Sequence, residues 1–164
     1  MLCKRILVSL GLVFICVQAH AGDVNRAFAA AQGGDFETAM DEWKPLAEQG
    51  FARAQYNIGV MHEMGEGVPQ DYKEAVKWYT LAAEQGYIFA QYNLALKYFD
   101  GNGVAKDRDE AVKWYTLAGE QGHVKSQYNL AVMYDTGDGI AEDNAAALKW
   151  YTLAANSGHI KSQY

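Results

Sequence analysis

Apolar residues recur along this chain at the spacing of one helix face. Two neighbouring stretches, 52–64 and 72–85, each carry apolar residues at i, i+4 and i+7. These positions are Ala54, Ile58 and Met61 in the first stretch and Ala75, Tyr79 and Ala82 in the second. This period is typical of amphipathic helices, which bury one face and expose the other. The pattern therefore predicts a pair of helices joined by a short connection.

Turn and capping residues mark the ends of these helices. Gly65 follows the last periodic residue of the first stretch, where glycine commonly ends a helix in the left-handed conformation. Asp71 is a favourable N-cap for the second stretch, and Glu74 three residues later completes a capping box. At the third occurrence Asp143 is followed by Ala146, which lacks the reciprocal carboxylate. We therefore expect the third cap to be weaker.

The whole pattern repeats with an offset of 36 residues. Glycines, tyrosines and Trp-Tyr pairs fall in register. They are Gly50, Gly86, Gly122 and Gly158; Tyr56, Tyr92, Tyr128 and Tyr164; and Trp78-Tyr79, Trp114-Tyr115 and Trp150-Tyr151. A fixed period between about 20 and 50 residues indicates a stacked array of supersecondary units. The predicted fold class is all-α, an α/α superhelical solenoid of helix-turn-helix repeats.

The register sets the predicted organisation of the chain. Three repeats cover 51–86, 87–122 and 123–158, and 159–164 begins a further, truncated repeat. Residues 22–50 form an atypical capping hairpin, in which Pro45 is expected to bend the second helix. The three tryptophans are expected in the core, where Trp78→Ala would cost about 3–5 kcal/mol.

At these residues the chain resembles the Sel1-like repeat family, which is related to the tetratricopeptide repeats. The resemblance lies in Ala54-Gln55-Tyr56-Asn57-Ile58-Gly59, in the stretch from Asp71 to Tyr79, and in Ala82-Ala83-Glu84-Gln85-Gly86. It covers 52–164, and 23–50 more loosely. The resemblance implies a right-handed superhelix whose first helices line the concave side, and an adaptor or scaffold role. Fold is fixed far better than partner by such a likeness.

By analogy with the related repeats, three sets of residues in register are expected on the concave face. They are Arg53, Phe89 and Lys125; Tyr56, Tyr92 and Tyr128; and Asn57, Asn93 and Asn129. An asparagine amide can donate to and accept from a peptide backbone, and tyrosine offers a large, rigid contact surface. These residues form the candidate partner-binding site. The alternative is structural: the asparagines satisfy polar groups within the solenoid and the tyrosines only pack.

The first 21 residues have the pattern of a secretory signal peptide. Lys4 and Arg5 precede an apolar run over 6–17, and Ala19-His20-Ala21 provides a cleavage site after Ala21. An uncleaved anchor is the alternative, but the run of about twelve residues is shorter than the roughly 20 that span a bilayer. A lipoprotein built on Cys16 is a weaker alternative. The expected location is periplasmic or secreted, without membrane insertion after cleavage.

Composition narrows the partner class. Both cysteines, Cys3 and Cys16, lie in the leader, so the processed chain has no disulfides. Cleavage removes two basic residues and no acidic one, which moves the formal net charge from −6 to −8. An acidic chain without basic clusters disfavours nucleic acid. The expected partner is therefore a protein or peptide.

Catalysis is the alternative class. Some cysteine-rich Sel1-like proteins have been associated with β-lactam binding or hydrolysis, so a weak hydrolase of β-lactam or cell-wall compounds is a second hypothesis. The processed chain lacks their paired cysteines, and neither a Ser-x-x-Lys nor a Gly-x-Ser-x-Gly segment occurs. His62, His123 and His159 are distributed one to a unit, which disfavours a metal site. The sequence predicts no catalytic residue, metal site or cofactor. A third hypothesis is a regulator whose active module lies beyond Tyr164.

Overall fold

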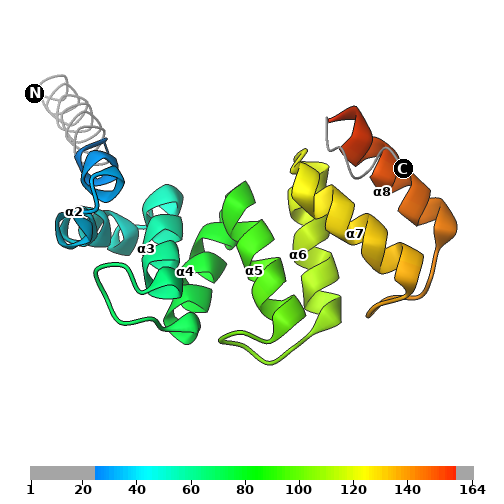
Figure 1. Cartoon of the computed structure of the whole chain (residues 1–164), viewed down its shortest axis with the longest axis horizontal. Helices are drawn as coiled ribbons and strands as arrows, with labels where there is room; N and C mark the ends of the chain where they lie inside the picture. The colour runs from blue at the N-terminus through cyan, green and yellow to red at the C-terminus, as the bar shows by residue number, and fades with distance from the viewer. Residues whose placement is uncertain (1–24, 158–164) are drawn as a thin grey trace, which may run out of the picture.

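The computed structural model describes residues 25–157, and in that range the chain is built from helices and short connections. A helix over 25–32 is followed by α2 (Phe36–Glu48), α3 (Ala52–Met64), α4 (Tyr72–Glu84), α5 (Ile88–Asp100), α6 (Arg108–Glu120), α7 (Val124–Thr136) and α8 (Asn144–Asn156). The helical hairpins follow one another along a curved path, so the two ends of the chain lie far apart (Figure 1). The predicted all-α solenoid is confirmed. The predicted leader and the truncated last repeat lie outside the described residues.

The first helix of each repeat ends as its glycine predicts. Gly65, Gly101 and Gly137 all adopt the left-handed conformation, with φ of 73°, 82° and 66°. The backbone N–H of Gly65 donates to the Met61 carbonyl, which would otherwise be left without a partner at the helix end.

The aspartate caps form, but the capping boxes do not. Asp71 accepts hydrogen bonds from the backbone N–H groups of Lys73 and Glu74. Its own N–H donates to the His62 carbonyl at 2.8 Å, so no donor remains for the Glu74 carboxylate. The Glu74 carboxylate accepts from Lys77 instead. The missing reciprocal glutamate at Ala146 therefore removes nothing, and the expectation of a weaker third cap is wrong: Asp143 accepts from two backbone N–H groups at 2.9 and 3.0 Å.

Small residues and tyrosines make the core between paired helices. Ala75, Ala111 and Ala147 are buried on the second helices, and Tyr79 and Tyr115 are almost completely enclosed. Trp114 and Trp150 are buried as expected. Trp78 is only partly buried, because it packs against the smaller N-terminal cluster rather than between two full repeats. The cost of Trp78→Ala should therefore fall below the range given above.

A glutamine latch joins each repeat to the one before it. Gln55, Gln91 and Gln127 are buried on the first helices, and each side chain donates to a carbonyl at the end of the preceding second helix, Ala47, Ala83 or Gly119. Gln85 and Gln121 in turn donate to the side-chain oxygens of Gln55 and Gln91 at 2.7 Å. Ser157 occupies the corresponding place in the last repeat, and the Gln127 oxygen has no partner among the described residues.

The N-terminal hairpin keeps its second helix through the proline. α2 runs from Phe36 to Glu48 with Pro45 inside it, so the proline does not end the helix. Asp35 caps this helix by accepting from the Thr38 N–H. Within 25–157, no helix combines the length and apolar character needed to cross a membrane.

Candidate protein-interaction surface

The predicted concave-face residues all lie on the first helices α3, α5 and α7. Arg53, Phe89 and Lys125 are exposed near the beginnings of these helices, and the three tyrosines and three asparagines are half-buried one turn later. Gln55, Gln91 and Gln127 point the opposite way, into the junction with the preceding hairpin. The repeat thus presents one short row of side chains from each first helix. Consecutive rows enclose hollows between the helices.

One hollow, here called the N-terminal hollow, lies at the beginnings of α5 and α7. It measures about 570 Å³, and its lining includes Tyr56, Phe89, Tyr92, Asn93, His123 and Lys125. The rings are in mutual contact: the Tyr92 ring lies 4.6 Å from that of His123 and the Phe89 ring 5.9 Å from it, between centroids. Phe89 remains 48% exposed. The result is a solvent-accessible aromatic floor with a lysine beside it.

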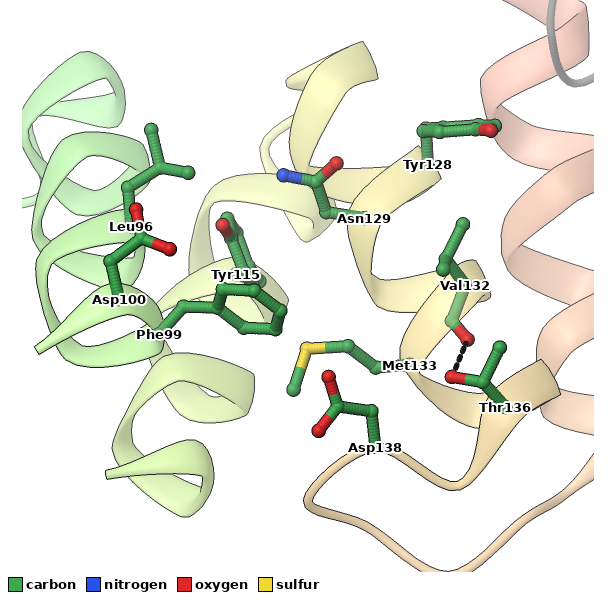
Figure 2. Close-up of a pocket in the computed structure, with 10 residues that line it drawn as sticks. All are labelled: Leu96, Phe99, Asp100, Tyr115, Tyr128, Asn129, Val132, Met133, Thr136 and Asp138. Atoms are coloured by element: carbon green, nitrogen blue, oxygen red, sulfur yellow. Dashed lines mark hydrogen bonds between the residues drawn. The ribbon is translucent and has the colours of Figure 1, made fainter. Parts of the chain in front are cut away.

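A second hollow, here called the C-terminal hollow, continues along the same pair of helices. It measures about 290 Å³ and is lined by Leu96, Phe99, Tyr128, Val132 and Met133, with Tyr115 and Asn129 deeper and the carboxylates of Asp100 and Asp138 nearby. Figure 2 shows Phe99 from α5 and Met133 from α7 reaching toward each other across it. The two hollows together form one groove between α5 and α7, from the beginnings of the helices to their ends.

The asparagines divide into two cases. Asn93 interacts through hydrogen bonding with the hydroxyls of Tyr56 and Tyr79 in the preceding repeat, and Asn129 does the same with Tyr92 and Tyr115. The structural alternative therefore accounts for part of their polar capacity. Because Asn93 and Asn129 also line the groove, they hold the tyrosines that form its wall.

Asn57 differs, because the capping hairpin supplies Trp43 where later repeats have Tyr79. The Asn57 amide nitrogen and the Trp43 indole nitrogen are both buried without a hydrogen-bond partner among the described residues. Both are donors, so neither can satisfy the other. They line a separate hollow of about 290 Å³ with Phe28 and Phe36. Arg53 lies over the Phe28 ring at 5.4 Å and so belongs to this N-terminal part.

The charge state of the groove follows from burial. Burial raises the pKa of the Tyr56 and Tyr92 hydroxyls, which therefore stay neutral donors at ordinary pH. Burial, and secondly Lys125, lower the pKa of His123. The His123 Nδ1 accepts from the Ser126 backbone N–H as the N-cap of α7, so the neutral ring carries its proton on Nε2.

The contact between Ser126 and His123 is a cap rather than a catalytic pair. The Ser126 hydroxyl lies 2.9 Å from Nδ1 of His123, but Ser126 is fully buried and no substrate can reach it. In residues 25–157, no three histidine, cysteine, aspartate or glutamate side chains converge in the way a metal ion requires.

Sequence reasoning missed two features of this surface. It treated His123 only as a possible metal ligand, although its place before a first helix, with Ser126 three residues on, is the position of an N-cap. It also gave no role to Glu63 and Lys97, which form a largely buried ion pair between α3 and α5. Each occurs once in the register, so the repeat offered no signal for them.

Comparison with known proteins agrees with the helical arrangement. The Sel1 repeat model matches residues 52–87, 88–123 and 124–159. Among curated proteins, "DAP3-binding cell death enhancer 1" of Rattus norvegicus is 40% identical over 43 residues, which cover 26% of this chain and 8% of that protein. The chain thus spans less than a tenth of that relative's length.

Solved structures extend the likeness over most of the chain. A protective antigen of uropathogenic Escherichia coli strains with an SLR fold is 38% identical, with a TM-score of 0.84, over 93% of this chain and 34% of its own. A Sel1 repeat protein from Oxalobacter formigenes is 34% identical, with a TM-score of 0.81, over 85% of this chain and 57% of its own. Cysteine rich protein B of Helicobacter pylori, at 16% identity and a TM-score of 0.62, covers 79% of this chain and 94% of its own and shares the fold alone.

Proposed function

The chain belongs to the Sel1 repeat family, and from that premise we propose that it is an exported scaffold that holds an extended segment of another protein in the groove between α5 and α7. Sel1 repeat proteins generally serve as protein-interaction scaffolds. The groove is preformed by helices on both sides, so little conformational entropy is lost on the scaffold side when a segment binds.

The observation that carries this proposal is the aromatic floor of the N-terminal hollow. Tyr56, Phe89, Tyr92 and His123 form a connected set of rings on a water-accessible face, and Phe89 is nearly half exposed. Aromatic side chains that combine a rigid apolar body with a polar end are the usual anchors of protein interfaces. Tyrosine hydroxyls and the His123 N–H supply donors for the backbone carbonyls of a bound segment.

Export is the second part of the proposal. It rests on the basic start, the short apolar run and the cleavage pattern after Ala21, which lie outside the described residues. Periplasmic or secreted placement follows from this reading. One relative is described as a protective antigen, a role compatible with export.

The binding proposal can be tested by selecting peptides on the immobilised protein from a random twelve-residue library displayed on phage. Enriched peptides should bind the parent protein and lose most of their affinity for a Phe89→Ala variant. Leu81→Ala is the matched control, because Leu81 is similarly exposed, at 44% against 48%, but lies on the second helix α4. Absence of any enriched peptide, or an equal loss in both variants, would contradict the proposed function.

A further inference from the structure

The first helices carry their charges in the order that the helix dipole disfavours. None of α3, α5 and α7 has an acidic residue in its first turn, and Arg53 and Lys125 occupy the second position of α3 and α7. Carboxylates lie in the last turns instead, at Glu63, Asp100 and Asp135. Cations at the beginning of a helix and anions at its end both reduce helix stability.

The second helices of the same repeats follow the ordinary order. Asp71 and Asp107 cap α4 and α6, and acidic residues occupy their first turns, at Glu74 in α4 and at Asp109 and Glu110 in α6. Composition alone therefore does not explain the reversal. It is confined to the helices that line the groove, which points to the surface they form rather than to helix stability.

The reversed charges reach the two ends of one groove. Lys125 lines the N-terminal hollow, and no carboxylate lines it with Lys125. Asp100 and Asp138 line the C-terminal hollow, which contains no lysine or arginine. Within 25–157, neither Lys125 nor Asp100 forms an ion pair, and both side chains are exposed. Asp138 is paired with Arg108 at 3.0 Å.

We propose that the groove between α5 and α7 selects a partner segment with an acidic side chain over the N-terminal hollow and a basic side chain over the C-terminal hollow. This inference rests on the proposed function and specifies its partner. The helix from Lys125 to Thr136 is about 17 Å long at ~1.5 Å per residue. An extended segment covers that length in about five residues at ~3.3 Å each. The two charges of the partner should therefore lie about five residues apart.

The apolar lining of the C-terminal hollow fits a basic side chain as well as its carboxylates do. Lysine and arginine lay their aliphatic stems along apolar surface and keep the charged end at a carboxylate. The chain itself supplies an example: the Arg108 guanidinium lies 3.4 Å from the Phe99 ring centroid and its Nε donates to Asp138. Asp100, on the other side of Phe99, remains available for a cation from the partner.

The phage selection tests this inference with three further proteins: Lys125→Glu, Asp100→Lys, and the double variant. Peptides selected on the parent should carry an acidic and a basic residue about five positions apart in one fixed order. Each single reversal should weaken their binding by about tenfold at low salt. The double variant should enrich peptides with the opposite order of charges.

Thermal unfolding of the same variants separates recognition from folding. Both single reversals place charges in the order that the dipole favours, so the melting temperature should stay equal or rise while peptide binding falls. Peptides that depend on Phe89 but show no ordered charge pair would overturn this inference and leave the proposed function standing. Failure to enrich any peptide would overturn both.

Discussion

The two junctions between full repeats solve the same packing problem with different chemistry. Between the first and second repeats, the Glu63 carboxylate accepts from the buried Lys97 ammonium and, at 2.5 Å, from the Tyr79 hydroxyl. Thirty-six residues on, between the second and third repeats, the corresponding residues are Phe99, Met133 and Tyr115. One junction is closed by an ion pair and a phenol, and the other by apolar contacts.

The difference shows what each solution gives the molecule. A buried ion pair loses hydration that its attraction only partly replaces, so it adds little net stability, but either charge left alone is costly. It therefore penalises any other pairing of these repeats. The apolar junction carries no such constraint, and Phe99 and Met133 are free to form the walls of the C-terminal hollow. The binding groove has thus formed where the ion pair is absent.

The strongest test of this comparison converts the charged junction into the apolar one. Lys97→Met alone places the residue of the second junction at the first and leaves the Glu63 carboxylate largely buried without its cation. We expect a loss of about 3–4 kcal/mol in the free energy of unfolding, measured by urea denaturation. Adding Glu63→Phe should recover most of that loss. A double variant as unstable as the single one would show that the charges are not the source of the penalty.

A loop glycine tests how closely the first two repeats approach. Gly103 has a φ of +80°, and a Cβ there would lie 2.2 Å from the Tyr72 carbonyl oxygen. Gly103→Ala should cost about 3 kcal/mol, since overpacking adds to the left-handed strain. Gly101→Ala is the control: its φ is +82°, but its Cβ would first meet a side-chain atom of Lys106 at 3.2 Å, so about 1–2 kcal/mol is expected. Equal losses by thermal unfolding would contradict the close approach.

The two core tyrosines allow a smaller, paired comparison. Burial, and secondly the hydrogen bond to Glu63, raise the pKa of Tyr79, whereas Tyr115 has burial but no carboxylate acceptor. Tyr79→Phe should therefore cost about 1.5 kcal/mol and Tyr115→Phe about half as much. The measurement is chemical denaturation of both variants. A larger loss at Tyr115 would indicate that Asn129, rather than a carboxylate, provides the important partner.

Local features of the fold could be predicted from the sequence because they depend on residues close together in the chain. The apolar period, Gly65 as a left-handed cap and Asp71 as an N-cap each need only a few neighbours. The capping box failed for a tertiary reason, since the Asp71 N–H is occupied by the His62 carbonyl of the preceding helix. Trp78 is less buried than its counterparts because its neighbour is the capping hairpin.

The candidate surface was predictable as a row of residues but not as a groove. Register alone placed the tyrosines and asparagines on one helix face. The division into two hollows depends on the spacing between helices, and the pairing of Glu63 with Lys97 joins residues 34 positions apart that have no counterparts in register. Such contacts are properties of the stacked array, and a single repeat does not contain them.

The smallest expected effect concerns His123, which belongs to the apolar junction and has no counterpart at the charged one, where Tyr87 occupies its place. Burial, and secondly Lys125, hold its pKa below the ordinary 6.5, so the unfolded chain binds a proton more readily than the folded one. Its contribution to stability is present above pH ~6.5 and is lost as the pH falls from there toward the folded-state value. Protonation also removes the Nδ1 acceptor that caps α7. The surrounding groups are Phe89, Tyr92, Ser126 and Lys125.

His123→Asn separates this titration from the cap, because asparagine is also a good N-cap but does not titrate. The variant should lose a little stability at pH 8 through its missing ring contacts. Between pH 6.5 and 5 its melting temperature should fall less than that of the parent, by a difference worth below about 1 kcal/mol. Parallel curves for the two proteins would mean that His123 titrates equally in both states. In that case the aromatic floor would be more open to water than its burial indicates, and the contrast between the two junctions would rest on Glu63 and Lys97 alone.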